Sequence, residues 1–308
     1  MSTQRLSALP PGRFRDTLRR LFGRAPLHLV IIAMCIVWSV PTVALLVSSF
    51  RDPRAIASSG WWNALFHPAQ WTLTNYDSVL SARGMSDAFV NSLIITIPST
   101  LFVIIVAAFA AYAFAWMKFP FRNPLFLIFV ALLVVPLQMT LIPILRLYSE
   151  ITIEGSVPVI GGNFFGVGSY SGLWIAHTAY GLPFAIFLLR NFFGALPREL
   201  FESAHLDGAS DLTIFFRIVL PLSGPAIAAL AIFQFLWVWQ DLLVALVLLG
   251  DPKLAPMTLQ ITNLVNSFGS NYQVLTAAAF LSMIVPLLIF FALQRYFVQG
   301  ILAGSVKG

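Results

Sequence analysis

Long apolar runs alternate with short polar stretches along the whole chain. A membrane-spanning helix needs about 20 consecutive, mainly apolar residues, and six runs meet this requirement. They lie at about 27–50, 89–116, 124–147, 171–193, 222–249 and 274–297. The pattern therefore predicts an all-α, polytopic membrane protein with six transmembrane helices.

Composition supports this class. Of the 308 residues, 59% are hydrophobic and only 10% are charged, whereas soluble domains have roughly 25% charged residues. The net charge of +6 does not indicate nucleic-acid binding, because the basic residues stand at the ends of the apolar runs, where membrane topology explains them.

Charge also orients the chain in the membrane. Six spans place both termini on one side, and that side receives thirteen of the eighteen basic residues. The positive-inside rule makes this side cytoplasmic, so we expect a basic cytoplasmic tail at 1–26 and a six-span domain at 27–308 in the cell (inner) membrane. The five basic residues on the outer side are Arg51, Arg54, Arg83, Arg146 and Lys253.

We expect the third predicted span to be broken by two of its prolines, Pro136 and Pro143, with Gln138 between them. A proline removes a backbone hydrogen bond and kinks a helix. A kink beside polar side chains in mid-membrane forms a pathway wall or is an ordinary kink resolved by neighbouring helices, and the sequence leaves both open.

Residues 197–221 form the most polar stretch between two spans, and we expect two short helices with a bend. Pro197 suits the start of the first helix, on which Leu200, Phe201 and Ala204 share one face. Gly208 is able to stop that helix in a left-handed conformation. Ser210 or Asp211 then caps the second helix.

The same loop carries a family resemblance. Its elements are Glu202-Ser203-Ala204, Asp207-Gly208-Ala209, and Ile218-Val219-Leu220-Pro221 followed by Leu222. This order resembles the cytoplasmic loop of ABC importer permeases, and the second and third elements are most similar to the carbohydrate (maltose/α-glucoside) branch. Ser203 stands where the family usually has alanine, a change small enough for the same packing.

The resemblance implies a type I ABC importer permease fold, in a bacterial or archaeal membrane, and a role in ATP-driven import of a sugar or oligosaccharide by alternating access. It makes this loop the coupling helix that docks on the ATPase. The implied coupling residues are Glu202, Ser203, Ala204, Asp207, Gly208 and Ala209. The implied partners are a second homologous permease, two ATP-binding subunits, an extracytoplasmic solute-binding protein, the sugar and the lipid bilayer.

We find no motif for chemistry in the chain itself. It has no phosphate-binding loop, so the resemblance implies that ATP and Mg²⁺ bind to the partner ATPase and that this chain binds no cofactor. The four histidines lie in different segments, while a zinc site needs several converging ligands. We therefore expect neither an enzyme nor a metal site.

Asp241 is the acidic residue deepest within a predicted span, and intramembrane acids are costly and often functional. It lines a pathway or holds helices together, with His177 or Arg190 as candidate partners. Other candidates for the pathway are Gln138, Gln240 and Trp237, whose side chains suit sugar hydroxyls and sugar faces. Trp237 and Trp239 equally suit packing, which we expect for at least one of them.

Three alternatives stay open at this point. The first is an ABC importer permease for a polyol, glycerol phosphate or another solute. The second is an ion-coupled secondary transporter that uses Asp241 as its proton site. The third is a membrane scaffold that transports nothing.

Overall fold

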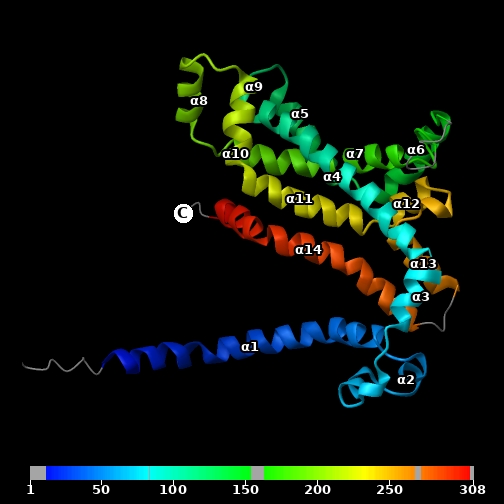
Figure 1. The fold of residues 1–308 in the computed structure, drawn as a ribbon. Helices are drawn as coiled ribbons and strands as arrows, with labels where there is room; N and C mark the ends of the chain where they lie inside the picture. The colour runs from blue at the N-terminus through cyan, green and yellow to red at the C-terminus, as the bar shows by residue number, and fades with distance from the viewer. Residues whose placement is uncertain (1–11, 83, 154–162, 268–271, 306–308) are drawn as a thin grey trace, which may run out of the picture.

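The computed structural model describes residues 12–82, 84–153, 163–267 and 272–305, and every named element within them is a helix (Figure 1). The all-α prediction is thus confirmed. The first eleven residues of the predicted basic tail, residues 154–162 of a predicted outside loop and the last three residues lie outside the described residues.

Among the described residues, four helices are long and apolar enough to cross a membrane. They are α1 (Gly12–Ser49), α4 (Met85–Trp116), α7 (Tyr170–Phe193) and α14 (Tyr272–Ser305). Two bent pairs also qualify when each is taken as one span, so the count of six stays a prediction. The first pair bends by 102° between α5 (Arg122–Leu132) and α6 (Leu137–Glu150), and the second by 75° where Asp211–Leu222 meets α11 (Gly224–Trp239).

Helices α4, α7, α11 and α14 pack into one bundle, while α1 diverges from it and approaches it only near its own C-terminal end (Figure 1). The α4–α7 contact is extensive and includes buried Ala107, Ala108 and Ala111 on α4, close to Ala185 and Leu189 on α7. Small residues let helix backbones approach closely in a membrane, so this pair forms the centre of the bundle.

The bend in the third predicted span coincides with one of its two prolines. Residue Pro136 stands immediately before α6, in an extended conformation. Pro143 lies inside α6, which continues to Glu150, so the expectation that Pro143 also breaks the span is wrong. A membrane helix is able to continue past a proline when other groups nearby satisfy the freed backbone carbonyl.

The predicted fifth span contains two helices. Helix α11 ends at Trp239, and α12 (Leu243–Leu248) begins after three intervening residues. The chain then passes through η4 (Pro252–Leu254) and α13 (Met257–Ser267) before it enters α14. The interruption places Gln240 and Asp241 at a break between helices, where backbone N–H groups need partners.

The segment after α1 folds around a buried arginine. It comprises α2 (Pro53–Ser58), η1 (Trp61–Leu65), η2 (Pro68–Gln70) and α3 (Thr74–Ala82). The Arg51 side chain is 1% exposed and donates to the carbonyls of Ala55 (2.9 Å) and Ser59 (3.1 Å) and to Oε1 of Gln70 (2.9 Å). Burial lowers the pKa of its guanidinium, and these acceptors compensate for the lost hydration.

Replacement of Arg51 by alanine is expected to loosen this segment. The change leaves several half-buried acceptors without their charged donor, and a hydrogen bond to a charged group contributes about 1.5–3 kcal/mol. We expect a loss of about 2–3 kcal/mol in the stability of residues 50–82, measured as faster limited proteolysis of the chain in nanodiscs. Arg54, which is exposed on the same segment, provides the control: Arg54→Ala should leave the cleavage rate unchanged, and equal rates for both variants would contradict the prediction.

Candidate functional site

The polar loop after α7 begins with helix α8 (Arg198–Leu206), which Pro197 precedes as its N-cap residue. Of the three residues predicted to share an apolar face, Phe201 and Ala204 are buried. Leu200 is 38% exposed, so the bundle covers only part of the face that these three residues were predicted to share. Helix α8 projects from the end of the molecule opposite to α2 and α3 (Figure 1).

A Schellman motif ends α8. The N–H of Ala209 donates to the carbonyl of Ala204 (2.9 Å), and the N–H of Gly208 donates to that of His205 (3.0 Å). Gly208 takes a φ of +79°, the left-handed conformation that this motif requires and that glycine adopts without a steric penalty. The prediction that Gly208 ends this helix in a left-handed conformation is thus confirmed.

The chain resumes in helical conformation at Asp211, after four residues that follow α8. The Oγ atom of Ser210 accepts from the N–H of Thr213 (3.3 Å) and caps α9 (Asp211–Ile214), which decides between the two capping candidates in favour of Ser210. A π-helical turn, η3 (Phe215–Val219), and α10 (Leu220–Leu222) then lead into α11. The ring of Phe215 stacks on Phe109 of α4, with 4.7 Å between centroids, so the segment from α9 to α10 packs against the bundle.

The outer face of α8 is polar except at its end. Glu202, Ser203 and Asp207 are exposed, and Leu206 is 89% exposed. An apolar side chain this exposed, beside a helix end held by the Schellman hydrogen bonds, is available for contact with a partner protein. The predicted coupling residues therefore divide into an exposed set (Glu202, Ser203, Asp207 and Gly208), a buried Ala204 and a half-buried Ala209.

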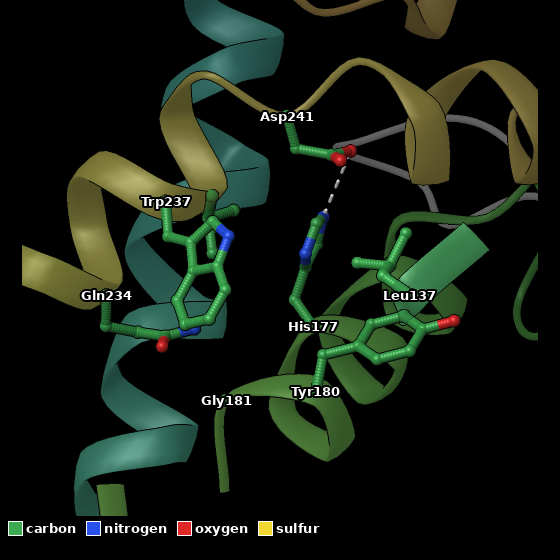
Figure 2. Close-up of a pocket in the computed structure, with 8 residues that line it drawn as sticks. Leu137, His177, Tyr180, Gly181, Gln234, Trp237 and Asp241 are labelled. Carbon is green, nitrogen blue, oxygen red and sulfur yellow. Dashed lines mark ion pairs between the residues drawn. The ribbon is translucent and has the colours of Figure 1, made fainter. Parts of the chain in front are cut away.

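A second polar site lies inside the bundle, at the break between α11 and α12. The two carboxylate oxygens of Asp241 accept from the N–H groups of Val244 (3.4 Å) and Ala245 (3.2 Å) at the start of α12. Oδ2 also lies 3.8 Å from Nε2 of His177 on α7, as Figure 2 shows. Asp241 therefore caps α12 and approaches α7 at the same time.

A small cavity of about 30 Å³ adjoins this pair. Gln234, which is 3% exposed, has a side-chain oxygen without a hydrogen-bond partner among the described residues. A Cβ added at Gly181 would lie 2.6 Å from that oxygen, so α7 has room for the amide only because residue 181 is glycine. The lining residues, labelled in Figure 2 except for Val238, are Leu137, His177, Tyr180, Gly181, Gln234, Trp237, Val238 and Asp241.

The structure brings together some of the predicted pathway residues and separates others. Trp237 and Asp241 line the cavity, and the Trp237 ring is 52% exposed. Gln138 and Gln240 are exposed and do not line it. Trp239 packs instead, with its ring stacked on Phe235 and Nε1 donating to the Ser282 carbonyl (2.9 Å), which confirms the packing expected for at least one of the two tryptophans.

Of the two partners proposed for Asp241, His177 is the one that the structure places beside it. Arg190 lies over the ring of Phe126, 4.6 Å from its centroid, so its pairing with Asp241 is wrong. Sequence reasoning missed Gln234 and Tyr180. Helical spacing contains the signal, because Gln234 lies seven residues before Asp241 and Tyr180 three residues after His177.

Comparison with known proteins gives consistent results. The family model described as "Binding-protein-dependent transport system inner membrane component" matches residues 90–303. The osmoprotective compounds uptake permease protein GgtD of Synechocystis sp. is 53% identical, over 96% of this chain and 97% of that protein. The α-glucoside transport system permease protein AglG of Rhizobium meliloti is 41% identical, over 92% of this chain and 98% of that protein.

Solved structures agree on the fold. One chain of a bacterial ABC transporter involved in the import of the acidic polysaccharide alginate superposes with a TM-score of 0.71, at 19% identity, over 94% of this chain and 100% of that chain. A second alginate transporter structure, which contains a pentasaccharide-bound periplasmic protein, gives a TM-score of 0.62 at 16% identity, over 90% of this chain and 96% of that chain. The fold is that of ABC importer permeases.

Proposed function

Since this chain belongs to the family of binding-protein-dependent transport system inner membrane components, we propose that it imports a sugar or short oligosaccharide and that α8 couples import to the ATPase. Members of this family are the membrane subunits of ABC importers, and ATP hydrolysis lies with a separate subunit. The chain is therefore a permease in the cell membrane, and not an enzyme. Family membership excludes the ion-coupled transporter and the scaffold as alternatives.

The exposed end of α8 is the observation that carries the coupling proposal. Leu206 projects from a helix whose other side is held by buried Phe201 and Ala204. We propose that Leu206 enters an apolar pocket of the ATPase, while Glu202 and Asp207 pair with basic groups around it. The Schellman motif at Gly208 fixes the direction of the chain beyond the helix, so a displacement of α8 carries α9 with it.

The substrate class is proposed from the relatives and from side chains at the break between α11 and α12 and at the start of α6. AglG is named as an α-glucoside permease protein and GgtD as one for osmoprotective compounds. The exposed Trp237 ring offers a face on which a sugar ring stacks, and Gln138, Gln240 and Asp241 offer polar groups for its hydroxyls. A polyol fits the same polar groups but would not use the flat tryptophan face.

A permease of this family works with a solute-binding protein and an ATPase. We propose that the complex contains a second, homologous permease and two ATP-binding subunits, which bind ATP and Mg²⁺ while this chain binds no cofactor. Helix α1 supports the second permease, because large apolar side chains such as Ile36, Val37 and Trp38 are exposed along it away from the bundle. Lipid and a neighbouring permease are the apolar surroundings that such a helix requires.

The proposal is tested by co-purification from native membranes. The wild-type chain should retain an ATP-hydrolysing subunit, and Leu206→Asp should lower the recovered ATPase at least tenfold, because a charge replaces the apolar anchor. Leu73, which is 64% exposed on the outward segment, gives the matched control, and Leu73→Asp should retain the ATPase. Absence of ATPase from the wild type, or equal recovery with Leu206→Asp, would overturn the docking of α8.

A further inference from the structure

Helix α8 is bound to the bundle through very few side chains. Its buried residues are Phe201 and Ala204, and Ala204 is too small to reach far into the bundle. The Phe201 ring lies flat on the indole of Trp116, with 3.6 Å between ring centroids and 17° between planes. This stack is therefore the principal contact between α8 and the transmembrane helices.

Trp116 joins more than one helix. It is the last residue of α4, and its Nε1 donates to the carbonyl of Phe193, the last residue of α7 (3.0 Å). One indole thus connects the ends of α4 and α7 to α8. Beyond it, α4 and α7 form the close alanine-rich contact at the centre of the bundle.

We propose that Trp116 is the positioning residue through which a displacement of α8 reaches α4 and α7. The inference rests on the proposed docking of the ATPase on α8. An indole has only two side-chain torsions, and here one face is stacked while the N–H is hydrogen-bonded. Close-packed interiors transmit displacement because they have little free volume, so a rigid stacked ring moves both helix ends, whereas a flexible side chain would absorb the motion.

A matched tryptophan separates transmission from simple packing. Trp174 on α7 donates from Nε1 to the Ile94 carbonyl on α4 (2.8 Å). It therefore links the same two helices by the same kind of hydrogen bond, but at positions further along both helices from α8. Replacement of either tryptophan weakens the α4–α7 contact, but of the two only Trp116 also contacts α8, through its stack with Phe201.

Hydrogen–deuterium exchange on the complex with its ATPase, in nanodiscs, tests the proposal without a transported substrate. Exchange is compared before and after trapping with ATP and vanadate, for wild type, Trp116→Leu, Trp116→Phe and Trp174→Leu. In the wild type, trapping should change exchange in α8 and at the ends of α4 and α7. In Trp116→Leu the change in α8 should remain, while the change at residues 112–116 and 189–193 falls at least threefold. Trp116→Phe should keep about half of the wild-type change at residues 112–116 and 189–193, and Trp174→Leu should behave as wild type.

Each other outcome has a defined meaning. A Trp116→Leu complex that still transmits the change, or a wild type without a change at α4 and α7, overturns the proposal. A wild type that binds no ATPase, or shows no change in α8, refutes the docking of α8 instead. If Trp116→Leu fails to assemble, Phe201→Leu tests the same stack from the other side, and failure of both to assemble makes the contact structural and also overturns the proposal.

Discussion

Replacement of Gly208 by proline is expected to abolish ATP-driven uptake by the assembled importer. Gly208 has a φ of +79°, whereas the proline ring fixes φ near −65°. Proline also removes the N–H that donates to the His205 carbonyl, so the Schellman motif cannot form. The end of α8 would unwind, and we expect at least a tenfold loss of bound ATPase and about a hundredfold loss of uptake, measured with vesicles that contain equal amounts of permease.

Gly208→Ala tests the cost of the left-handed backbone conformation alone, without a steric clash of the added side chain. An added Cβ meets nothing within 4 Å, so the cost is the left-handed conformation alone, about 1–2 kcal/mol. We expect this variant to keep uptake within about tenfold of wild type. Gly224 is equally open but has no positive φ, and Gly224→Ala should have no effect. Normal ATPase retention and uptake in Gly208→Pro would contradict the role of α8 in coupling.

The loop around α8 was predictable because its signals are local. A proline before the helix, a glycine after it and a serine before the next helix each act within a few residues. The family motif adds the function implied for the same residues. What the local signals could not give is which side chains the bundle covers: Leu200 is exposed although it stands beside buried Phe201, because the covering partner, Trp116, lies 85 positions away in the sequence.

Polar pairs within the bundle were predictable only as candidates. His177 and Arg190 both lie on α7, and the sequence does not say which turn of α7 faces Asp241. The structure places His177 beside Asp241 and Arg190 on Phe126. The burial of Arg51 was hidden for the same reason, because its acceptors come from α2 and from Gln70, and only the folded segment brings them together.

A run of apolar residues does not show where a helix within it ends. The run at 222–249 contains the polar pair Gln240-Asp241, but such a pair is equally compatible with a continuous helix, so the sequence did not predict that α11 ends at Trp239. The break depends on Asp241, which supplies acceptors for the first N–H groups of α12. In a membrane, a helix start without such a partner is costly because no water replaces it, so Asp241 accounts for how the chain tolerates the break between α11 and α12.

Replacement of Asp241 by leucine is expected to destabilise the permease and to lower uptake strongly. The substitution leaves the N–H groups of Val244 and Ala245 without their acceptor and leaves His177 without the neighbouring acid. A lost cap costs about 1 kcal/mol at the surface, and buried unsatisfied donors cost about 1–3 kcal/mol each, so we expect the permease to lose about 2–4 kcal/mol. Thermal denaturation of the detergent-solubilised complex and uptake into vesicles provide the measurements, with uptake falling at least thirtyfold.

Asp241→Asn distinguishes the capping role from a need for charge. Asparagine caps helices as well as aspartate does and keeps one oxygen for α12, so we expect uptake within about threefold of wild type. Asp251 gives the control, because it caps η4 from an exposed position, and Asp251→Leu should cost only about 0.5–1 kcal/mol. If Asp241→Asn lost uptake as completely as Asp241→Leu while remaining equally stable to heat as wild type, the negative charge itself would be required. Asp241 would then act on the transported solute or on His177 through that charge, and the cap would be secondary.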